Sequence, residues 1–130
     1  MTKIFTVKGT PVGKPRMTRS DKWNQRDCVV AYRNWADSAR AAIQRTTKLT
    51  LKKPTTLIVT AYFQVPASWS HKRKSLALTE PHTVKPDADN LLKAVMDALF
   101  ENDQMVTEAR ICKKWAGLDG PRIHVELTEL

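Results

Sequence analysis

The chain has 130 residues, 42% of them hydrophobic, so it can bury the core of a single domain (1–130) without a disulfide. Its 22 lysines and arginines outnumber its 13 aspartates and glutamates, and the net charge of +9 favours a polyanionic partner such as nucleic acid, although a basic protein without such a partner has the same charge. Two cysteines without CxxC spacing argue against a zinc site, and no apolar run suits a signal peptide or membrane span, so we expect a cytoplasmic protein.

The first half of the chain predicts a strand, a basic loop, a helix and a second strand. Polar and apolar residues alternate over 3–8, and Gly and Pro then open a basic loop over 9–27 that contains the aromatic residue Trp23. Apolar residues recur at steps of three and four over 28–46, which predicts a helix with one buried face. β-Branched and aromatic residues over 55–65 predict a buried strand.

The second half predicts one further helix and two further strands. The segment 67–85 carries basic residues and a short apolar patch, and we expect it to be partly helical. Apolar spacing predicts a helix over 88–100. Strands over 104–115 and 122–127 follow, joined by a turn that contains Gly and Pro. This order predicts an α/β (α+β) fold, with a mixed sheet of about four strands packed against two main helices.

Two aspartates stand at the start of the second predicted helix. Pro86 fixes its own φ and disfavours helix before it, so Asp87 and Asp89 fall at or next to the first turn. A carboxylate there accepts unpaired backbone N–H groups, and capping alone is a sufficient explanation for either residue. One cap needs only one carboxylate, however, and two crowded carboxylates repel each other unless a divalent cation binds them.

The stretch 87–103 is acidic within a basic chain. It holds five of the 13 acidic residues and one basic residue, Lys93. Lys93 lies one turn after Asp89, where it can pair with that carboxylate or reach a phosphate above it. Carboxylates without neighbouring His or Cys favour magnesium or manganese over zinc. A basic protein with one acidic pocket is typical of phosphodiester hydrolysis.

The segment 85–99, KPDADNLLKAVMDAL, and the NDQMV that follows at 102–106 resemble the signature of RusA-type Holliday junction resolvases. That signature has a Pro-Asp-x-Asp-Asn-Leu-x-Lys core, an Asp-Ala-Leu helix end and an Asp-Asp-x-Gln-Val-like turn. The resemblance implies a Mg²⁺-dependent homodimer, with Mn²⁺ as substitute and no small-molecule cofactor, that resolves four-way DNA junctions by paired nicks in recombination and repair. Phages and prophages commonly encode such proteins. A magnesium nuclease acting on forks, flaps or RNA and a non-catalytic nucleic-acid-binding protein are the alternatives.

The resemblance also assigns roles to residues. Asp87, Asp89 and Asp103 would be the metal-binding catalytic carboxylates, and Lys93 would be the catalytic lysine beside them. Where the family often has two adjacent aspartates, this chain has Asn102 and Asp103, so a shift of one residue would place Asn102 in the ligand position.

Other residues are expected to support DNA binding or the ligands. Asp97 either contacts the metal-binding residues without binding the metal itself or has a structural role. Trp23, Trp69 or Phe5 is a candidate wedge for the branch point, although packing is the first expectation for each. Eight basic residues are candidates for contacts with the DNA backbone, and each is as readily an ordinary solvated charge: Lys14, Arg16, Arg19, Lys22, Lys72, Arg73, Lys74 and Lys85.

Overall fold

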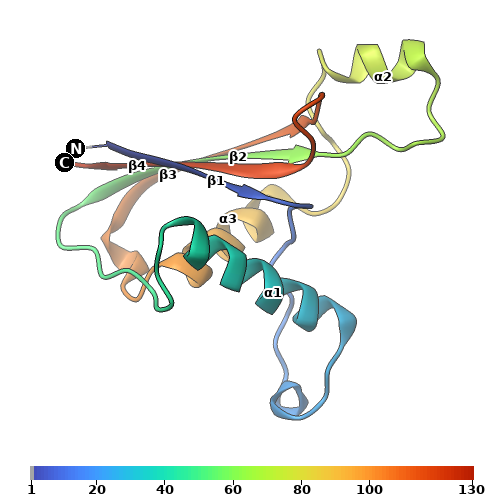
Figure 1. Ribbon diagram of the computed structural model, residues 1–130. Coiled ribbons are helices and arrows are strands. Elements are labelled where there is room, and N and C mark those ends of the chain that lie inside the picture. Colours follow the sequence, from blue (N-terminus) through green and yellow to red (C-terminus); the bar gives the residue numbers. More distant parts are fainter. Residues whose placement is uncertain (1) are drawn as a thin grey trace.

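Four strands pair into one mixed sheet in the computed structural model, which describes residues 2–130 (Figure 1). The spatial order is β1-β4-β2-β3, in which β4 is antiparallel to both of its neighbours and β2 is parallel to β3. The strands are β1 (Thr2–Lys8), β2 (Thr55–Phe63), β3 (Val106–Trp115) and β4 (Arg122–Glu129), and the helices are α1 (Asp27–Ala42), α2 (His71–Ala77) and α3 (Ala88–Leu99). The predicted α+β fold with a mixed sheet is confirmed.

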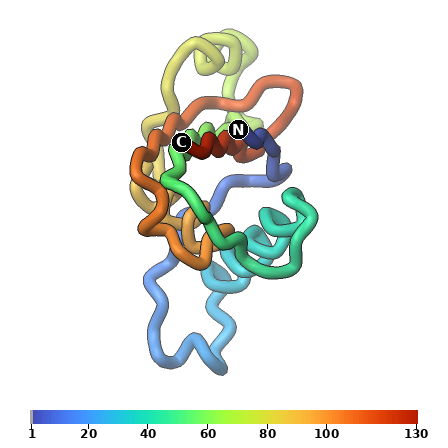
Figure 2. The backbone as a smooth tube through the Cα atoms, turned by 90° about the vertical axis from the view of Figure 1, so that its left-hand side faces the viewer, coloured from blue at the N-terminus to red at the C-terminus, as the bar shows by residue number. Residues whose placement is uncertain are grey.

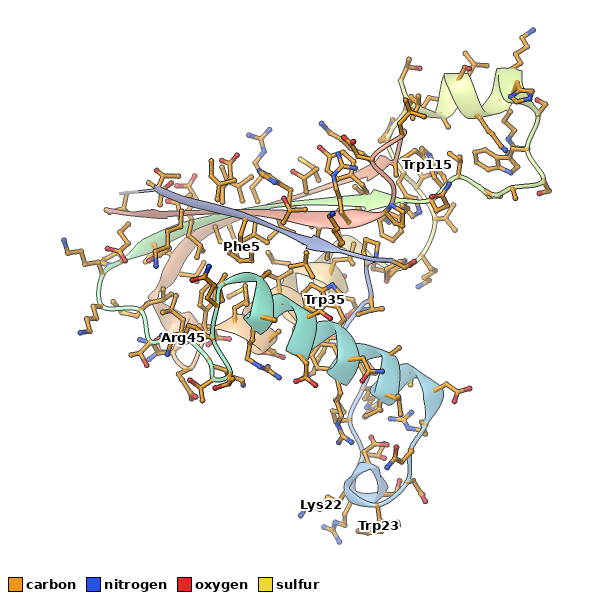
Figure 3. The ribbon with its side chains drawn as sticks, in the orientation of Figure 1. Phe5, Lys22, Trp23, Trp35, Arg45 and Trp115 are labelled. Carbon is orange, nitrogen blue, oxygen red and sulfur yellow. The ribbon has the colours of Figure 1, made fainter. Side chains whose placement is uncertain are left out.

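Alternation along the strands decides which face of the sheet is covered. Every second residue of β2, beginning at Thr55, is buried, while the residues between them are half-buried. The buried side chains of β2 and β4 meet the apolar stripes of α1 and α3, which lie on the same side of the sheet (Figure 1). Trp35 of α1 points into this core, as Figure 3 shows.

Two segments project from this body in opposite directions, as Figure 2 shows. The loop before α1 extends on the helix side, and it contains a short 3-10 turn, η1 (Arg19–Lys22). The segment with α2 extends on the other side, which confirms a partly helical 67–85. No helix within residues 2–130 has the length and apolar character needed to cross a membrane.

Element ends differ from the predictions where local geometry changes. The first helix, predicted to reach residue 46, ends at Ala42, and Gln44 then adopts a positive φ of 59°. The third strand begins at Val106 instead of residue 104, because Asp103–Met105 forms a 3-10 turn (η2). In the chain, α3 lies between β2 and β3. Because these two strands are parallel, the connecting helix returns the chain in the opposite direction and is antiparallel to both.

Candidate active site

The start of α3 presents two exposed carboxylates. The peptide bond before Pro86 is cis, Asp87 is the N-cap residue, and Asp89 lies in the first turn. The Asp87 side chain is 53% exposed, and both of its oxygens lie 3.2 Å from Lys85 Nζ. Within residues 2–130, no backbone amide donates to the Asp87 carboxylate as a cap. Capping therefore does not account for Asp87.

Lys93 and Asp89 lie one turn apart on α3, and both are exposed. Neither takes part in an ion pair with another residue of the described chain. The expected pairing of Lys93 with Asp89 is therefore not formed. Both charged groups remain accessible to a ligand.

Asp103 lies at the opposite end of α3, in η2. The twelve residues of α3 span about 18 Å along the helix axis, and β3 starts beyond the last turn of α3, so the start of β3 lies at the opposite end of the strands from the start of α3. Within residues 2–130, no three His, Cys, Asp or Glu side chains lie close enough to hold one metal ion. One chain thus brings Asp87 and Asp89 together but leaves Asp103 apart from them.

Asn102 has a structural role that the sequence reasoning missed. Its Oδ1 accepts a hydrogen bond from Leu51 N at 2.8 Å, and its Nδ2 donates to Leu51 O at 2.7 Å. These two bonds fix the turn after α3 against the segment before β2. Asn102 is occupied in this way, whereas the exposed Asp103 side chain has no hydrogen-bond or ion-pair partner within residues 2–130. The assignment of the third ligand to Asp103 stays a prediction.

Lys14 and Asp97 join the basic loop to α3. Lys14 Nζ lies 3.3 Å from Asp97 Oδ2 and 4.6 Å from the centroid of the Tyr32 ring, and Lys14 N donates to Asn90 O at 3.1 Å. A Cβ at Gly13 would lie 3.1 Å from the Cβ of Pro86, so the loop approaches the helix closely. Burial, followed by the charge of Asp97, raises the pKa of Tyr32 to about 12. Asp97 therefore positions the loop, and the ammonium of Lys14 is occupied within the protein.

An open cleft lies beside the contact between this loop and α3. Its volume is about 650 Å³, and it reaches Lys93 on the exposed side of the helix. The residues that line it are Lys14, Pro15, Arg16, Met17, Asn90 and Lys93. Half of these side chains are basic, so the cleft suits a phosphodiester backbone close to the aspartates.

Asp21 shapes the tip of the loop, which the sequence reasoning also missed. The buried Asp21 carboxylate accepts hydrogen bonds from Thr18 N at 2.6 Å and from Arg26 Nε at 2.9 Å. The guanidinium of Arg26 and then Thr18 hold the pKa of Asp21 well below its usual range. Thr18 and Asp21 have the spacing of a capping box, a signal present in the sequence. This ordered turn presents Trp23, 67% exposed, at the tip beside Lys22 (Figure 3).

The other two candidate wedges are less available. Phe5 packs against the core from β1, and the Trp69 ring lies 5.1 Å from the Trp115 ring. The guanidinium of Arg73 lies 4.0 Å from the Trp69 ring centroid, so Arg73 contributes to the attachment of α2. Packing is therefore the observed role of Phe5 and Trp69, whereas Trp23 is exposed.

The remaining basic candidates lie on three separate elements. Lys85 pairs with Asp87, and Lys72 is exposed on α2 while its neighbour Lys74 is half-buried there. Arg16, Arg19 and Lys22 are exposed on the loop before α1. The loop and the residues before α3 lie next to the aspartates, whereas α2 projects from the other side of the sheet (Figure 1).

Comparison with known proteins identifies the family. A family model described as Endodeoxyribonuclease RusA matches residues 8–128. The chain is also similar to the uncharacterized protein YqaN of Bacillus subtilis (strain 168), with 31% identity over 137 residues that cover 97% of this chain and 95% of that protein. The family model spans the acidic pair, the basic loop, β2, β3 and all but the last residue of β4. The chain therefore belongs to the RusA family of endodeoxyribonucleases.

Proposed function

We propose that this protein is a Mg²⁺-dependent endonuclease that resolves four-way DNA junctions by paired nicks, acting as a homodimer in the cytoplasm. The observation that carries the proposal is the exposed pair of carboxylates at the start of α3, beside a basic cleft, in a chain of the RusA family. Asp89 has no partner in the described part of the chain, and Asp87 is not used as a cap and pairs only with the exposed Lys85, which a divalent cation can displace.

The donor set suits a hard divalent ion. Asp87 and Asp89 offer carboxylate oxygens, which Mg²⁺ and Mn²⁺ prefer. When bound, the ion would supply activation of water and neutralisation of charge on the scissile phosphate. Because α3 separates Asp103 from the pair, we assign the third carboxylate to Asp103 of a second copy.

Lys93 acts on the phosphate in this proposal. It is exposed one turn along α3 from Asp89 and lines the cleft, so its ammonium can approach a phosphate held at the aspartates. A fixed positive charge there stabilises the negative charge that develops on the phosphate oxygens during hydrolysis. Lys93 is thus assigned as the catalytic lysine.

The DNA contacts follow from the exposed basic surface. The exposed Trp23 ring can stack on an unpaired base at the branch point. A four-way junction has approximate two-fold symmetry, and a two-fold dimer presents two pockets for two opposed cuts. Lys14 pairs with Asp97, Lys85 with Asp87, and Arg73 lies on the Trp69 ring, so the backbone contacts next to the aspartates are assigned to Arg16, Arg19 and Lys22. Lys72 and Lys74 on α2 are assigned to a more distant arm of the junction.

A comparison of substrates tests the activity. We expect cleavage of a four-way junction in the presence of Mg²⁺ or Mn²⁺, loss of cleavage with a chelator, and little cleavage of linear duplex. Asp89→Asn should abolish cleavage while folding and junction binding remain, and Asp119→Asn, at an exposed acidic residue in the turn between β3 and β4, is the matched control. Equal cleavage of linear duplex would refute junction selectivity, and preferred cleavage of forks, flaps or RNA would reassign the substrate.

Mixed dimers test whether the site is shared between chains. Asp89→Asn removes a ligand from the α3 pocket, and Asp103→Asn removes the ligand expected from the other chain. In a shared site, a dimer of one subunit of each variant keeps one intact site and nicks one strand of the junction. No nicking by mixed dimers that demonstrably form would overturn the shared site, because it would mean that each chain supplies all of its own ligands.

A further inference from the structure

The face of the sheet opposite α1 and α3 carries a row of basic side chains. No helix of the described chain covers this face, and α2 projects on the same side, beyond the ends of β2 and β3 (Figure 1). The strand registers make four residues cross-strand neighbours near this end of the sheet, in the order Lys8, Arg122, Tyr62 and Lys114. Because Ile123, next to Arg122, is buried in the core, the four side chains point to the uncovered face. We call this set the basic row.

The charges of the basic row are not balanced by neighbouring carboxylates. Lys8 and Lys114 are exposed, and neither they nor Arg122 form an ion pair within residues 2–130. Lys8 and Arg122 lie directly opposite each other on β1 and β4, and like charges in such a pair destabilise a sheet. Asp119, in the turn between β3 and β4, has no ion pair with the row in the same range. Stability of the fold therefore does not explain the row, whereas a bound anion would remove its repulsion.

Arg122 is held in place at the centre of the row. Its guanidinium carbon lies 3.8 Å from the centroid of the Tyr62 ring, and its Nη1 donates to Gly120 O at 2.9 Å. A guanidinium has five N–H donors, so most of them remain for a ligand. A guanidinium fixed in this way loses little freedom when it binds, and its fork of donors matches the oxygens of a phosphate. Arg122 therefore suits a phosphate, with a flexible lysine on either side of it.

The excess of positive charge is confined to this end of the face. The next row across the strands consists of Thr6, His124, Thr60 and Cys112. The row after that contains one acidic residue, Glu126, and one basic residue, Arg110. A polyanion that follows the positive charge therefore crosses the strands along the basic row. Adjacent strands are about 4.8 Å apart, so the row spans about 14 Å, which is roughly the rise of four base pairs of DNA.

We propose that the basic row binds the phosphate backbone of DNA, as a second contact surface separate from Asp87 and Asp89. The partner is DNA because the chain belongs to a family of endodeoxyribonucleases. The row and the start of α3 lie at the same end of the strands but on opposite faces of the sheet. A branched DNA with one arm at the aspartates can therefore lay a second arm across the row, on the side where α2 presents Lys72. The inference rests on the proposed function in this one respect, that the substrate is branched.

Two charge-reversal double variants test this surface. Lys8→Glu with Lys114→Glu, the row variant, is compared with Lys52→Glu and Lys53→Glu, a control at exposed lysines before β2 that changes the net charge equally. Binding to a four-way junction is measured by fluorescence anisotropy without divalent metal, over a series of salt concentrations. The row variant should raise the dissociation constant roughly tenfold or more and lower the log–log salt slope by about two, one for each lost phosphate contact. Equal losses in the two double variants, with unchanged unfolding midpoints, would overturn the proposal.

A linear duplex and a cleavage assay separate this inference from the proposed nuclease. The row variant should lose less affinity for a linear duplex than for the junction, because the duplex offers no second arm, and an equal loss would overturn the second-arm role. At saturating protein with Mg²⁺, the row variant should cut the junction at the wild-type rate.

The two proposals can fail independently. Wild-type junction binding by a row variant that still cleaves overturns the basic row alone. A wild-type protein that does not cleave, but whose junction binding the row variant weakens, overturns the proposed nuclease alone. A row variant that has lost its self-association in sedimentation equilibrium would assign the row to contacts between copies of the chain, and this outcome too would overturn the DNA surface.

Discussion

Replacement of Asn102 tests whether this residue is a structural clamp, because the family's usual aspartate at this place would break half of its contacts. The Asn102 side chain donates to Leu51 O at 2.7 Å and accepts from Leu51 N at 2.8 Å. In Asn102→Asp the accepting bond remains, but the donor to Leu51 O is replaced by a carboxylate oxygen. The part-buried carbonyl then loses its partner and faces a negative charge.

The cost follows from the contacts that are lost. One hydrogen bond contributes about 1 kcal/mol, and a buried group left without a partner costs about 1–3 kcal/mol, so we expect a loss of about 2 kcal/mol in the free energy of unfolding. For 130 residues this lowers the midpoint of thermal unfolding by roughly 7 °C. Asn102→Ala should lose a similar amount, since it removes both bonds and leaves both Leu51 groups to solvent.

Thermal and urea unfolding, monitored by circular dichroism, measure this change. The deficit of Asn102→Asp relative to wild type should shrink below about pH 4, because the protonated carboxyl can again donate to Leu51 O. The aspartate should bring no gain in cleavage, since position 102 holds Leu51 and binds no metal. Unchanged stability of both variants, or cleavage raised by Asn102→Asp, would refute the clamp and favour position 102 as the ligand.

Three further substitutions separate stability from activity. Asp21→Asn should lower the free energy of unfolding at neutral pH. Because folding lowers the pKa of Asp21, the difference in stability between wild type and variant is present above about pH 4 and is lost as the pH falls below it. Unfolding of both proteins measured along an acid titration checks this. Trp23→Ala should weaken junction binding by about 1–3 kcal/mol while leaving the unfolding midpoint unchanged, and the control Leu118→Ala, at a residue still more exposed than Trp23, should affect neither in gel-shift and melting assays. Lys93→Ala should slow single-turnover cleavage by about 100-fold with stability within about 0.5 kcal/mol of wild type, and wild-type turnover would exclude its catalytic role.

Local signals in the sequence were sufficient for most of the fold. Pro86 and the apolar stripe that follows predicted α3 to within one residue at its end, and the β-branched run predicted β2. The acidic pair was placed correctly at the helix start because Pro86 limits where the helix can begin. These features depend on residues within one or two turns of each other, so periodicity and single-residue preferences reveal them.

Contacts between distant segments could not be predicted in this way. Asn102 bonds to Leu51, a residue 51 positions earlier, and no periodicity links the two. The capping box of Thr18 and Asp21 is visible in the sequence, but its stabilisation by Arg26 requires the loop to close on itself. The ion pair of Lys14 with Asp97 likewise depends on how the loop folds onto α3. Each of these polar contacts uses residue types that are equally common on a solvated surface.

The position of Asp103 follows from the topology. When a helix connects two parallel strands, it runs antiparallel to them, so residues at the start of the helix and residues just after it lie at opposite ends of the strands. Asp89 lies in the first turn of α3 and Asp103 lies beyond its last turn, so the length of the helix keeps them from binding one ion within a chain, however close they are in sequence. Two carboxylates alone bind a divalent ion more weakly than three, so cleavage per chain should fall on dilution as the dimer dissociates. A specific activity independent of protein concentration across the dimer dissociation constant would show that the third ligand comes from elsewhere in the same chain.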